Sequence, residues 1–488
     1  MTPLKDTYPL YLAGEPISPN TDLAVPDKHT RETACRVPLA GPELIEEAIA
    51  EAERAAPATA ALPAHRRAAV LDACVDRFRA RADELALALC VEAGKPIADS
   101  EGEVTRLIET FAVAAGEATR INGEIIEMEI SPRTEGYRAM TKRVPIGPCA
   151  FITPFNFPLN LVAHKVAPAI ACGCPFVLKP ADKTPVGALI MAEILADASA
   201  AVGADMGVPG ALPPGSFSVI CCEVEHAAPL IDDERLRLLS FTGSDTVGRA
   251  LAAKAGVKRV VLELGGNAAC VVDEGVDLDD CAARILHGGY YQSGQSCVSV
   301  QRIIAHERVY GDLRERLRDG VAKLKSGDPK DRSVKIGPLI DETAARRVEA
   351  WIAEATAAGA TVLAGGTRKD SVVEATLIEN VPRDAKLCRE EVFGPVTVLS
   401  SFASFEDALA DVNDSRFGLQ AGVFTNDLRR AHLAWDTLEV GAVIINDVPS
   451  FRADHMPYGG VKQSGLGREG VRPAIHDMTE PRLMVVRG

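Results

Sequence analysis

Cys297 has surroundings that suggest chemistry. It lies in the segment YYQSGQSCVSVQR, where Gly, Ser and Gln replace the aliphatic neighbours that are usual for a cysteine in a protein core. This composition predicts a loop between a helix and a strand. A thiol on such a loop can serve as a nucleophile if it is accessible and its pKa is depressed. The alternative is that Cys297 is a structural cysteine.

Two polar side chains at the ends of apolar segments are further candidates. Glu263 ends an apolar run in VLELGGNAACVVD, and Gly265 and Gly266 follow it, which lets the backbone turn sharply or approach a ligand closely. Asn156 stands after the apolar start of ITPFNFPLN and before a predicted helix, where its amide can donate a hydrogen bond to a developing oxyanion. The alternatives are a solvated Glu263 at a strand end and an Asn156 that only caps the helix.

The elements that must position these residues alternate between strands and helices. From Cys149 to Asp273, short apolar runs separated by helical segments predict a parallel sheet with helices on both faces. These runs are CAFITP, PFVLKP, SFSVICC, RLRLLSFTG and KRVVLEL. A second series extends from about Asp277 to Asn446, with strands QRIIAH, VTVLSSF and GAVIIND. Ligands of such sheets bind beyond the carboxyl ends of the strands, which is where the candidate residues stand.

Amphipathic helices and one hairpin complete this α/β organisation. Helical periodicity predicts helices over 42–56, 66–93 and 100–120, with Gly94 ending the second. Near Gly123 the period changes, and EIIEMEI, SPRTEG and YRAMTKRV predict two strands joined by a loop. Because a lone hairpin is marginally stable in water, we expect it to pack on another subunit beside the C-terminal strand PRLMVV. An ordinary surface hairpin on the same subunit is the alternative.

The composition is that of a soluble globular chain. Its 488 residues are 47% hydrophobic and 25% charged, which suggests two to four domains. The net charge of −15 argues against nucleic acid or an anionic membrane as the main partner. The 12 cysteines lack zinc-site spacing, so no metal is expected, and free thiols in this number suit the cytoplasm. Neither a secretory signal nor an apolar run long enough to span a membrane is visible.

Seven ordered motifs carry a resemblance over nearly the whole chain. They are PFNFP, LKPAD, FTGS, LELGGN, GQSC, EEVFGP and PYGGVKQSGLGREG. In this order, and with this spacing between Glu263 and Cys297, the sequence resembles the aldehyde dehydrogenase superfamily. Within it, the chain is most similar to the bacterial branch that handles lactaldehyde-like, phosphonoaldehyde and other small polar aldehydes.

The resemblance implies a three-part α/β architecture. A Rossmann-like NAD-binding domain would comprise 1–123 and 147–262, and an α/β catalytic domain would comprise 263–472. A small β oligomerisation element, 124–146 and 473–488, would bridge subunits in a homodimer or homotetramer.

The resemblance also implies a covalent mechanism. Cys297 would attack the aldehyde carbon to give a thiohemiacetal, while the Asn156 side chain and the Cys297 backbone N–H would hold the oxyanion. Loss of hydride to the nicotinamide would leave a thioester. Glu263 would then act as the general base that activates the hydrolytic water.

The expected cofactor is NAD. Lys179 would bind the adenosine ribose hydroxyls, with Asp182 beside it, where relatives commonly have Glu. A carboxylate there repels a 2′-phosphate, although the shorter Asp leaves NADP open as a second cofactor. The segment FTGSDTVG opens a helix, so Gly243 and Ser244 would lie near the pyrophosphate.

At the other end of the cofactor, Glu391 in EEVFGP would hold the nicotinamide ribose, and Phe393 would pack near it. The alternative for these cofactor residues is that they have no function, because a charged residue at the end of a strand or loop is usually just exposed to solvent. Only their place in the motifs favours a role in cofactor binding.

The resemblance places the substrate near the segment NDVPSFRADHMPYGG. Phe451 and Arg452 would line the aldehyde tunnel, and Arg106 is similarly placed in relatives that accept anionic aldehydes. Two arginines suit a carboxylate, phosphate, phosphonate or sulfonate tail. The alternative for each arginine is a surface or interface ion pair. His164 and His455 are expected to be structural.

Three other functions compete with aldehyde oxidation to the acid. CoA-acylating relatives pass the acyl group to CoA, but they usually lack the base found here as Glu263. Catalytically silent, NAD-binding structural relatives tend to lose the nucleophile or the base. A thiol protease or esterase needs a histidine partner for Cys297, and the segment YYQSGQSC contains none.

Overall fold

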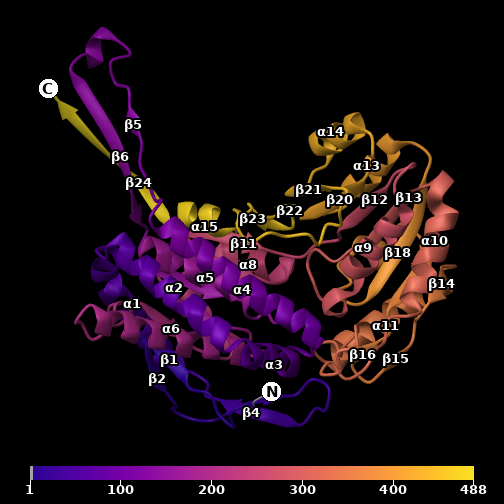
Figure 1. The fold of residues 1–488 in the computed structure, drawn as a ribbon, viewed down its shortest axis with the longest axis horizontal. Helices are drawn as coiled ribbons and strands as arrows, with labels where there is room; N and C mark the ends of the chain where they lie inside the picture. Colours follow the sequence, from indigo (N-terminus) through magenta and orange to yellow (C-terminus); the bar gives the residue numbers. More distant parts are fainter. Residues whose placement is uncertain (1–3) are drawn as a thin grey trace.

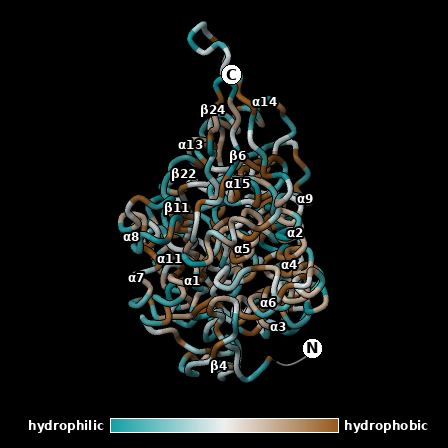
Figure 2. Tube along the Cα trace, turned by 90° about the vertical axis from the view of Figure 1, so that its left-hand side faces the viewer, coloured by the Kyte–Doolittle hydropathy of each residue, from teal (hydrophilic) through white to brown (hydrophobic). Residues whose placement is uncertain are grey.

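The computed structural model describes residues 4–488, so residues 1–3 of the predicted first domain lie outside the described residues. The chain forms two lobes, each built around a β-sheet, and a β-arm that projects away from the first lobe (Figure 1). Each lobe has its own core of buried apolar side chains. Figure 2 shows the tip of the β-arm extending well beyond the rest of the chain.

An eight-stranded sheet forms the first lobe, in the order β2-β1-β9-β8-β7-β10-β11-β23. Its strands are β1 (Leu10–Leu12), β2 (Glu15–Ile17), β7 (Cys149–Ile152), β8 (Phe176–Lys179), β9 (Phe217–Val219), β10 (Leu238–Thr242), β11 (Arg259–Glu263) and β23 (Gly465–Leu466). The five strands from β9 to β11 are parallel, as the alternating pattern predicted. From β7 the chain runs outward through β8 and β9, then returns to β10 on the other side of β7. This reversal creates a crevice at the carboxyl ends of the strands.

Helices cover both faces of this sheet. They are α1 (Pro42–Ala60), α2 (Ala64–Ala80), α3 (Ala82–Ala93), α4 (Ile97–Ala118), α5 (Asn160–Cys172), α6 (Val186–Asp205), α7 (Ala228–Asp232) and α8 (Asp245–Lys254). Within 4–488, α6 alone is long and apolar enough to cross a membrane. However, 72% of its most apolar stretch is buried inside the fold, which is the environment of a core helix.

The predicted helix over 66–93 is wrong in one respect, because the structure has two helices there. The backbone leaves the helical conformation at Arg81 (φ −112°, ψ 22°). The Arg81 side chain binds Glu84 in the first turn of α3 at 2.7 Å and Glu193 of α6 at 3.2 Å, which fixes the bend. Gly94 ends α3 in the left-handed conformation (φ 68°), as predicted.

A seven-stranded sheet forms the second lobe, in the order β14-β17-β18-β13-β12-β20-β21. Its strands are β12 (Ala269–Val272), β13 (Arg302–His306), β14 (Thr361–Ala364), β17 (Thr376–Glu379), β18 (Val396–Phe402), β20 (Gln420–Phe424) and β21 (Ala442–Ile445). Only β14 runs antiparallel to its neighbour. The helices of this lobe are α9 (Leu278–Tyr290), α10 (Glu307–Val321), α11 (Glu342–Ala357), α12 (Lys386–Arg389), α13 (Phe405–Asn413) and α14 (Leu428–Thr437).

The β-arm contains the predicted hairpin. It consists of β5 (Ile125–Ile126), β6 (Tyr137–Pro145) and β24 (Thr479–Arg487). β24 pairs with β6 along its whole length, from Thr479 opposite Pro145 to Arg487 opposite Tyr137, so the C-terminal strand lies beside the hairpin as expected. The first strand of the hairpin, β5, has only the two residues Ile125–Ile126, whereas the segment EIIEMEI predicted a longer strand.

Short strand pairs complete the structure: β3 (Leu23–Pro26) with β4 (Thr33–Val37), β15 (Arg368–Lys369) with β16 (Val372–Val373), and β19 (Phe417–Gly418) with β22 (Val461–Lys462). Before the arm, the chain returns from the second lobe to the first. β23 pairs with β11 through Leu262 and Leu466, and α15 (Val471–Asp477) contributes Val471 and Ile475 to the first core. The predicted domain boundary at 472 falls inside this returning segment, which ties the two lobes together.

Candidate active site

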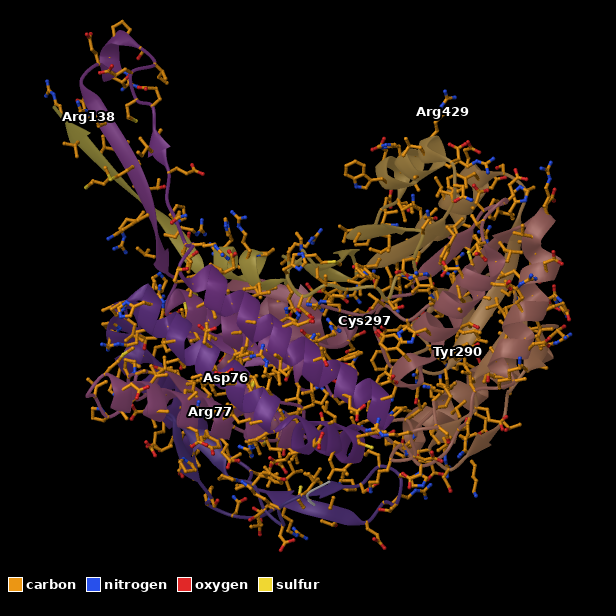
Figure 3. The ribbon with its side chains drawn as sticks, in the orientation of Figure 1. Asp76, Arg77, Arg138, Tyr290, Cys297 and Arg429 are labelled. Atoms are coloured by element: carbon orange, nitrogen blue, oxygen red, sulfur yellow. The ribbon has the colours of Figure 1, made fainter. Side chains whose placement is uncertain are left out.

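Cys297 lies on the loop between α9 and β13, as the sequence predicted, and Figure 3 shows it where the two lobes meet. The turn that precedes it, η3 (Tyr291–Gly294), contains Gln292 and Ser293 at φ 53° and 55°. This backbone conformation is strained for residues with a side chain, and such strain concentrates at functional sites. Asp99 holds the turn by accepting a hydrogen bond from the Gln292 N–H at 2.8 Å.

The thiol of Cys297 differs from most others in the chain. All 12 cysteines are free, and only Cys297 and Cys388 are partly exposed. The Cys297 Sγ lies 3.0 Å from the hydroxyl of Tyr458. Burial, joined by the negative charges of Glu391 and Glu263, raises the pKa of the Cys297 thiol to about 12, against the lowering effects of the Tyr458 hydrogen bond and the Arg452 charge. The thiol is therefore protonated at neutral pH in this state.

Asn156 is buried directly beside the cysteine loop. Its Nδ2 donates a hydrogen bond to the backbone carbonyl of Gln295 at 3.0 Å, two residues before Cys297. In return, the Gln292 side chain donates to the backbone carbonyl of Asn156 at 3.0 Å. The amide N–H groups of Asn156 thus face the loop that carries the thiol.

Asn156 does not cap the following helix, so that alternative is wrong. The first N–H groups of α5, from Leu159 and Asn160, donate instead to Glu103 of α4 at 2.9 and 3.0 Å. Glu103 is itself paired with the fully buried Lys95. The helix end is satisfied from α4, which leaves the Asn156 side chain free to face the cysteine loop.

Glu263 ends β11 with its side chain inside the protein, so the solvated alternative is also wrong. The residue is 3% exposed, and neither carboxylate oxygen has a hydrogen-bond partner within residues 4–488. Burial and the charge of Glu469 raise the pKa of Glu263 well above its usual value, despite nearby Arg452 and Lys165. A buried carboxylate without a partner is costly unless it is protonated or binds water or a ligand.

Glu469 organises the charges beside Glu263. It accepts hydrogen bonds from Lys165 Nζ at 2.8 Å and from Arg452 Nη2 at 3.2 Å, and all three side chains are buried. Burial alone raises the pKa of Glu469, but the two positive charges outweigh it and hold the pKa at about 2. Sequence reasoning assigned no role to Glu469, Lys165 or Tyr458. The only signal was that Tyr458 and Glu469 lie in the long C-terminal motif.

Gly265 and Gly266 permit the close approach that their type predicted. A Cβ on Gly266 would lie 2.2 Å from the Cys297 carbonyl oxygen, and one on Gly265 would lie 2.7 Å from Glu391 Oε2. The Gly266 N–H donates to Glu391 Oε1 at 2.9 Å. Burial raises the pKa of Glu391 to about 7, against this hydrogen bond. Glu391 therefore lies at the same junction as Cys297 and Glu263. Phe393 (φ 50°) stands nearby, its ring edge-on to Phe155 at 5.7 Å.

The remaining predicted cofactor residues lie at the carboxyl edge of the first sheet. Lys179 ends β8, is 6% exposed, and binds Asp182 at 2.6 Å. Ser244 caps α8 by accepting a hydrogen bond from the Val247 N–H at 3.4 Å, and Gly243 precedes it after β10. A lysine beside a carboxylate and an open helix N-terminus can bind ribose hydroxyls and a pyrophosphate, respectively.

Two apolar side chains make this edge suitable for a dinucleotide. Val224, after β9, is 81% exposed, and Val247, on α8, is 46% exposed. Exposed apolar groups at a sheet edge provide a surface on which a flat base can pack. The residues present therefore fit a nicotinamide dinucleotide.

The two predicted substrate arginines form ion pairs with carboxylates of the chain, and the predicted phenylalanine is partly exposed. Arg106 of α4 binds Asp454 at 2.7 Å and keeps 27% of its side chain exposed. The Arg452 side chain is only 7% exposed, and its guanidinium stacks on the Tyr458 ring, 3.7 Å from the ring centre. Phe451 is 48% exposed. It lines a cavity of about 490 Å³ together with Asp280, Ala283, Arg284, His287, Asp447, Val448, Ser450 and Arg452.

The two histidines behave differently. His164 is fully buried and binds Asp454 at 2.8 Å, and burial lowers its pKa to about 4, so it is neutral and structural as expected. His455 is exposed on the same loop as Asp454.

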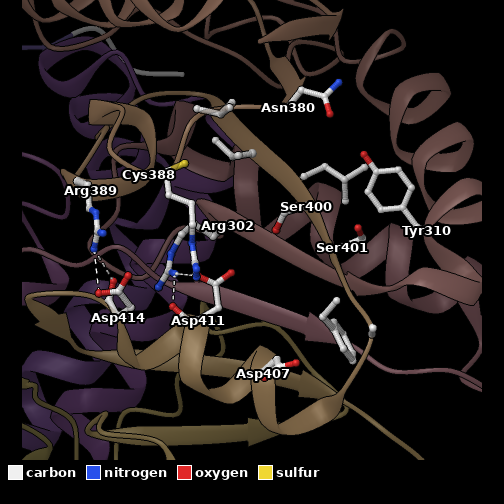
Figure 4. Close-up of a pocket in the computed structure, with 16 residues that line it drawn as sticks. Arg302, Tyr310, Asn380, Cys388, Arg389, Ser400, Ser401, Asp407, Asp411 and Asp414 are labelled. Atoms are coloured by element: carbon white, nitrogen blue, oxygen red, sulfur yellow. Dashed lines mark hydrogen bonds and ion pairs between the residues drawn. The ribbon is translucent and has the colours of Figure 1, made fainter. Parts of the chain in front are cut away.

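A cavity of about 530 Å³ opens elsewhere, on the second lobe (Figure 4). Several of its charged groups are paired with groups of the chain itself. Arg389 binds Asp414 at 3.0 Å, Arg302 donates to the Asp411 carbonyl at 2.8 Å, and Arg383 pairs with the Asp411 carboxylate. It contains none of the predicted site residues, so size alone does not identify the site.

The fold and site are those of a dinucleotide-dependent α/β enzyme. Comparisons with known proteins give the family. Residues 16–484 match the aldehyde dehydrogenase family. A 3-sulfolactaldehyde dehydrogenase from Priestia aryabhattai is 40% identical over 480 residues, 98% of each chain. The crystal structure of aldehyde dehydrogenase 21 from Physcomitrella patens, in complex with the reaction product succinate, is 46% identical with a TM-score of 0.95. That match covers 100% of this chain and 99% of the other.

A third structure bears on the cofactor. Glyceraldehyde-3-phosphate dehydrogenase from Methanocaldococcus jannaschii, complexed with NADP, is 33% identical with a TM-score of 0.91. The match covers 96% of this chain and 100% of that one. The chain belongs to the aldehyde dehydrogenase family and is an NAD(P)-dependent oxidoreductase that acts on an aldehyde. The resemblance and the fold class inferred from the motifs are confirmed.

The raised pKa of Cys297 predicts how its reactivity depends on pH. Because only the thiolate is alkylated, the rate of iodoacetamide modification in the cofactor-free enzyme should rise about tenfold per unit between about pH 7 and pH 9. Mass spectrometry of the Cys297 peptide measures the rate, with the Cys388 peptide as internal comparison. A plateau below about pH 8 would contradict a pKa raised by burial.

Proposed function

We propose that this protein oxidises a small anionic aldehyde to the carboxylic acid through a covalent thioester on Cys297. The observation that carries the proposal is the junction between the lobes. There a partly exposed thiol, the buried amide of Asn156 and the unpaired carboxylate of Glu263 gather around one loop. These are the groups that acyl chemistry on a thiol requires.

The first step is addition of the Cys297 thiolate to the aldehyde carbon, which forms a carbon–sulfur bond and moves the carbonyl electrons onto oxygen. The Asn156 Nδ2 and the Cys297 backbone N–H stabilise this oxyanion. Nδ2 already faces the loop through the Gln295 carbonyl, so a small side-chain movement brings it to the substrate oxygen. The loss of one such donor typically costs about 2.7–4 kcal/mol in the transition state.

NAD(P), when bound, would supply the hydride acceptor for oxidation of the thiohemiacetal. Lys179 and Asp182 would hold the adenosine ribose, and Gly243 with the Ser244-capped helix would face the pyrophosphate. Glu391 and Phe393 would hold the nicotinamide end. The Asp182 carboxylate, bound to Lys179 at 2.6 Å, favours NAD over NADP because it repels a 2′-phosphate.

Glu263 completes the cycle as the general base. It takes a proton from a water molecule, whose oxygen attacks the thioester carbon and releases the acid and the Cys297 thiol. The raised pKa of Glu263 suits this role, because a carboxylate with a raised pKa is a stronger base and takes a proton from water more readily than an ordinary carboxylate.

Arg106 and Arg452 support an anionic tail on the substrate. Arg106 on α4 binds Asp454, which lies on the loop that carries Phe451 and Arg452, and the charge of Arg452 acts on the Cys297 thiol. The Nε of Arg452 is buried without a hydrogen-bond partner in the described chain. A buried donor of this kind is satisfied by an anionic oxygen. The named activity of the Priestia relative and the succinate bound to the Physcomitrella enzyme favour a sulfonate or carboxylate tail.

Glu263 favours hydrolysis over transfer to CoA, and the presence of both thiol and base argues against a silent structural protein. A histidine-assisted thiol protease is disfavoured because the hydrogen-bond partner of Cys297 Sγ within 4–488 is Tyr458.

The β-arm supports assembly into a homodimer or homotetramer. Leu483, Met484, Val485 and Val486 of β24 are 45–55% exposed, and Ile125 of β5 is 90% exposed. Both β24 and β21 are unpaired edges of their sheets within the described chain. Exposed apolar edges of this kind are normally covered by another chain. The free state of all 12 cysteines is in keeping with a cytoplasmic location.

The proposed reaction predicts NAD(P) reduction with small acidic aldehydes. A screen of sulfonated, phosphorylated, carboxylated and hydroxylated aldehydes should show activity that Cys297→Ala abolishes while NAD binding stays unchanged. Product analysis with CoA present should still yield the free acid. Retained activity in the variant would refute the nucleophile, and acyl-CoA as product would refute hydrolysis.

Glu263→Gln should slow thioester hydrolysis by about 100-fold or more, because the amide cannot accept the proton from water. A rapid first turnover of reduced cofactor should remain in stopped-flow measurements, followed by a slow steady state. In the wild type the hydrolysis rate should fall as pH drops through the raised pKa of Glu263, since the protonated carboxyl is no longer a base. An unchanged steady state with hydrolysis rate-limiting would count against this role.

Arg106→Gln should raise KM for anionic aldehydes by about 10-fold to 100-fold, the usual value of a hydrogen bond to a charged group. Neutral aldehydes of the same length are the control and should change little. Equal effects on both substrates would remove the anion-binding role.

A further inference from the structure

Tyr458 is a buried phenol whose side chain contacts the nucleophile. It is 3% exposed, and its hydroxyl lies 3.0 Å from Cys297 Sγ, which is the hydrogen-bond partner that the described chain provides for it. A buried tyrosine hydroxyl normally finds a partner, so the contact with sulfur is part of the design of this site. The aldehyde oxidation scheme given above assigns this residue no role.

The position of the phenol is fixed by its backbone and its ring. Tyr458 and Glu469 exchange backbone hydrogen bonds at 2.9 and 2.6 Å, and the ring packs with Val298 and Leu419 beside Cys297. On its other face lies the Arg452 guanidinium, 3.7 Å from the ring centre, which Glu469 holds in turn. The hydroxyl therefore has little freedom to turn away from the sulfur.

The chemistry of the two groups fixes the direction of the hydrogen bond once the thiol loses its proton. A thiolate can only accept, and a phenol is the better donor of the pair. The stacked Arg452 cation draws electron density from the ring and so makes the hydroxyl a stronger donor. Burial raises the pKa of Tyr458 itself, so the phenol keeps its proton and does not serve as the base.

We propose that Tyr458 is a catalytic residue that donates its hydroxyl hydrogen bond to the Cys297 thiolate and so raises the fraction of reactive thiolate before the aldehyde arrives. The proposal rests on Cys297 as the nucleophile. Ionisation breaks the S–H bond and releases the proton to solvent, the electron pair stays on sulfur, and the Tyr458 O–H turns toward it. Addition to the aldehyde then transfers that electron pair into the new carbon–sulfur bond.

The sulfur needs such a donor because little else at the site favours its negative charge. Glu391 and Glu263 both lie near enough to disfavour the thiolate, and burial does so most strongly. The favourable influences are the Tyr458 hydroxyl and the charge of Arg452 behind it. Arg452 thus acts on the thiol through Tyr458 as well as on the substrate tail.

The test is the alkylation rate of Cys297 in Tyr458→Phe, which removes one oxygen and leaves the ring in place. A hydrogen bond to a charged group corresponds to about 10-fold to 100-fold in thiolate population. Because a thiolate of higher pKa is also more nucleophilic, the rate at a fixed pH should fall by about 3-fold to 10-fold. Iodoacetamide modification of the Cys297 peptide, followed by mass spectrometry from about pH 7 to pH 9, measures it.

Tyr290→Phe is the matched control. Tyr290 is an equally buried phenol, but its hydroxyl lies 2.7 Å from Thr397 Oγ1 and donates to the Thr376 carbonyl at 3.0 Å, away from the sulfur. In Tyr290→Phe, the alkylation rate of Cys297 should match that of the wild type. NAD binding and the thermal midpoint of each variant show whether it is folded.

Each outcome decides the proposal. A parallel downward shift of the rate–pH line in Tyr458→Phe alone supports it. An unchanged rate in folded Tyr458→Phe overturns it, whether or not turnover falls, because a loss of turnover alone would make Tyr458 a substrate contact. Aldehyde oxidation that survives complete alkylation of Cys297 would overturn the nucleophile itself, which is a separate failure.

Discussion

The close approach of two backbone segments at Gly266 is the constraint on which the site depends. The segment after β11 passes so near the cysteine loop that a methyl group on Gly266 would overlap the Cys297 carbonyl oxygen. This contact brings a strand end of the first lobe against a loop of the second. Glu263 lies three residues before Gly266, and Glu391 accepts a hydrogen bond from the Gly266 N–H. A larger residue at 266 would push the lobes apart and separate the thiol from the base, even if each lobe kept its own core.

Buried charge is distributed unevenly around that contact, and the distribution has chemical consequences. Glu469 takes both nearby cations, Lys165 and Arg452, and remains ionised. Among residues 4–488 Glu263 finds no hydrogen-bond partner, and its raised pKa holds it closer to its protonated form. The pKa values of the two carboxylates are therefore shifted in opposite directions, lowered for Glu469 and raised for Glu263. This is typical of catalytic pairs in which the environment separates the pKa values. Burying a carboxylate without a partner lowers the stability of the fold, so stability alone would favour pairing or replacing it. We therefore attribute the buried position of Glu263 to its function.

The predicted substrate arginines illustrate how partners alter the interpretation of a charged residue. Both the anion-binding role and the ion-pair alternative were open for Arg106 and Arg452, and the structure contains ion pairs at both. An ion pair does not exclude a ligand, because a guanidinium has five N–H donors and these carboxylates use only some of them. The Asp454 and Glu469 carboxylates orient the arginines, which reduces the conformational entropy lost when a substrate binds.

The sequence alone determined the α/β class, the parallel strands from β7 to β11, the loop around Cys297 and the family. These follow from local patterns: apolar runs of strand length, glycines at turns, and motifs in a fixed order. It did not determine the bend at Arg81, the capping of α5 by Glu103, or the meeting of Tyr458 with Cys297. Those features depend on contacts between residues far apart in the chain. Tyr458 and Cys297, for example, are 161 residues apart, and a hydrogen bond between them produces no recognisable pattern in either local sequence. Only the tertiary structure, which places the two lobes in contact, decided which of the buried polar groups share the site and what charge each one carries there.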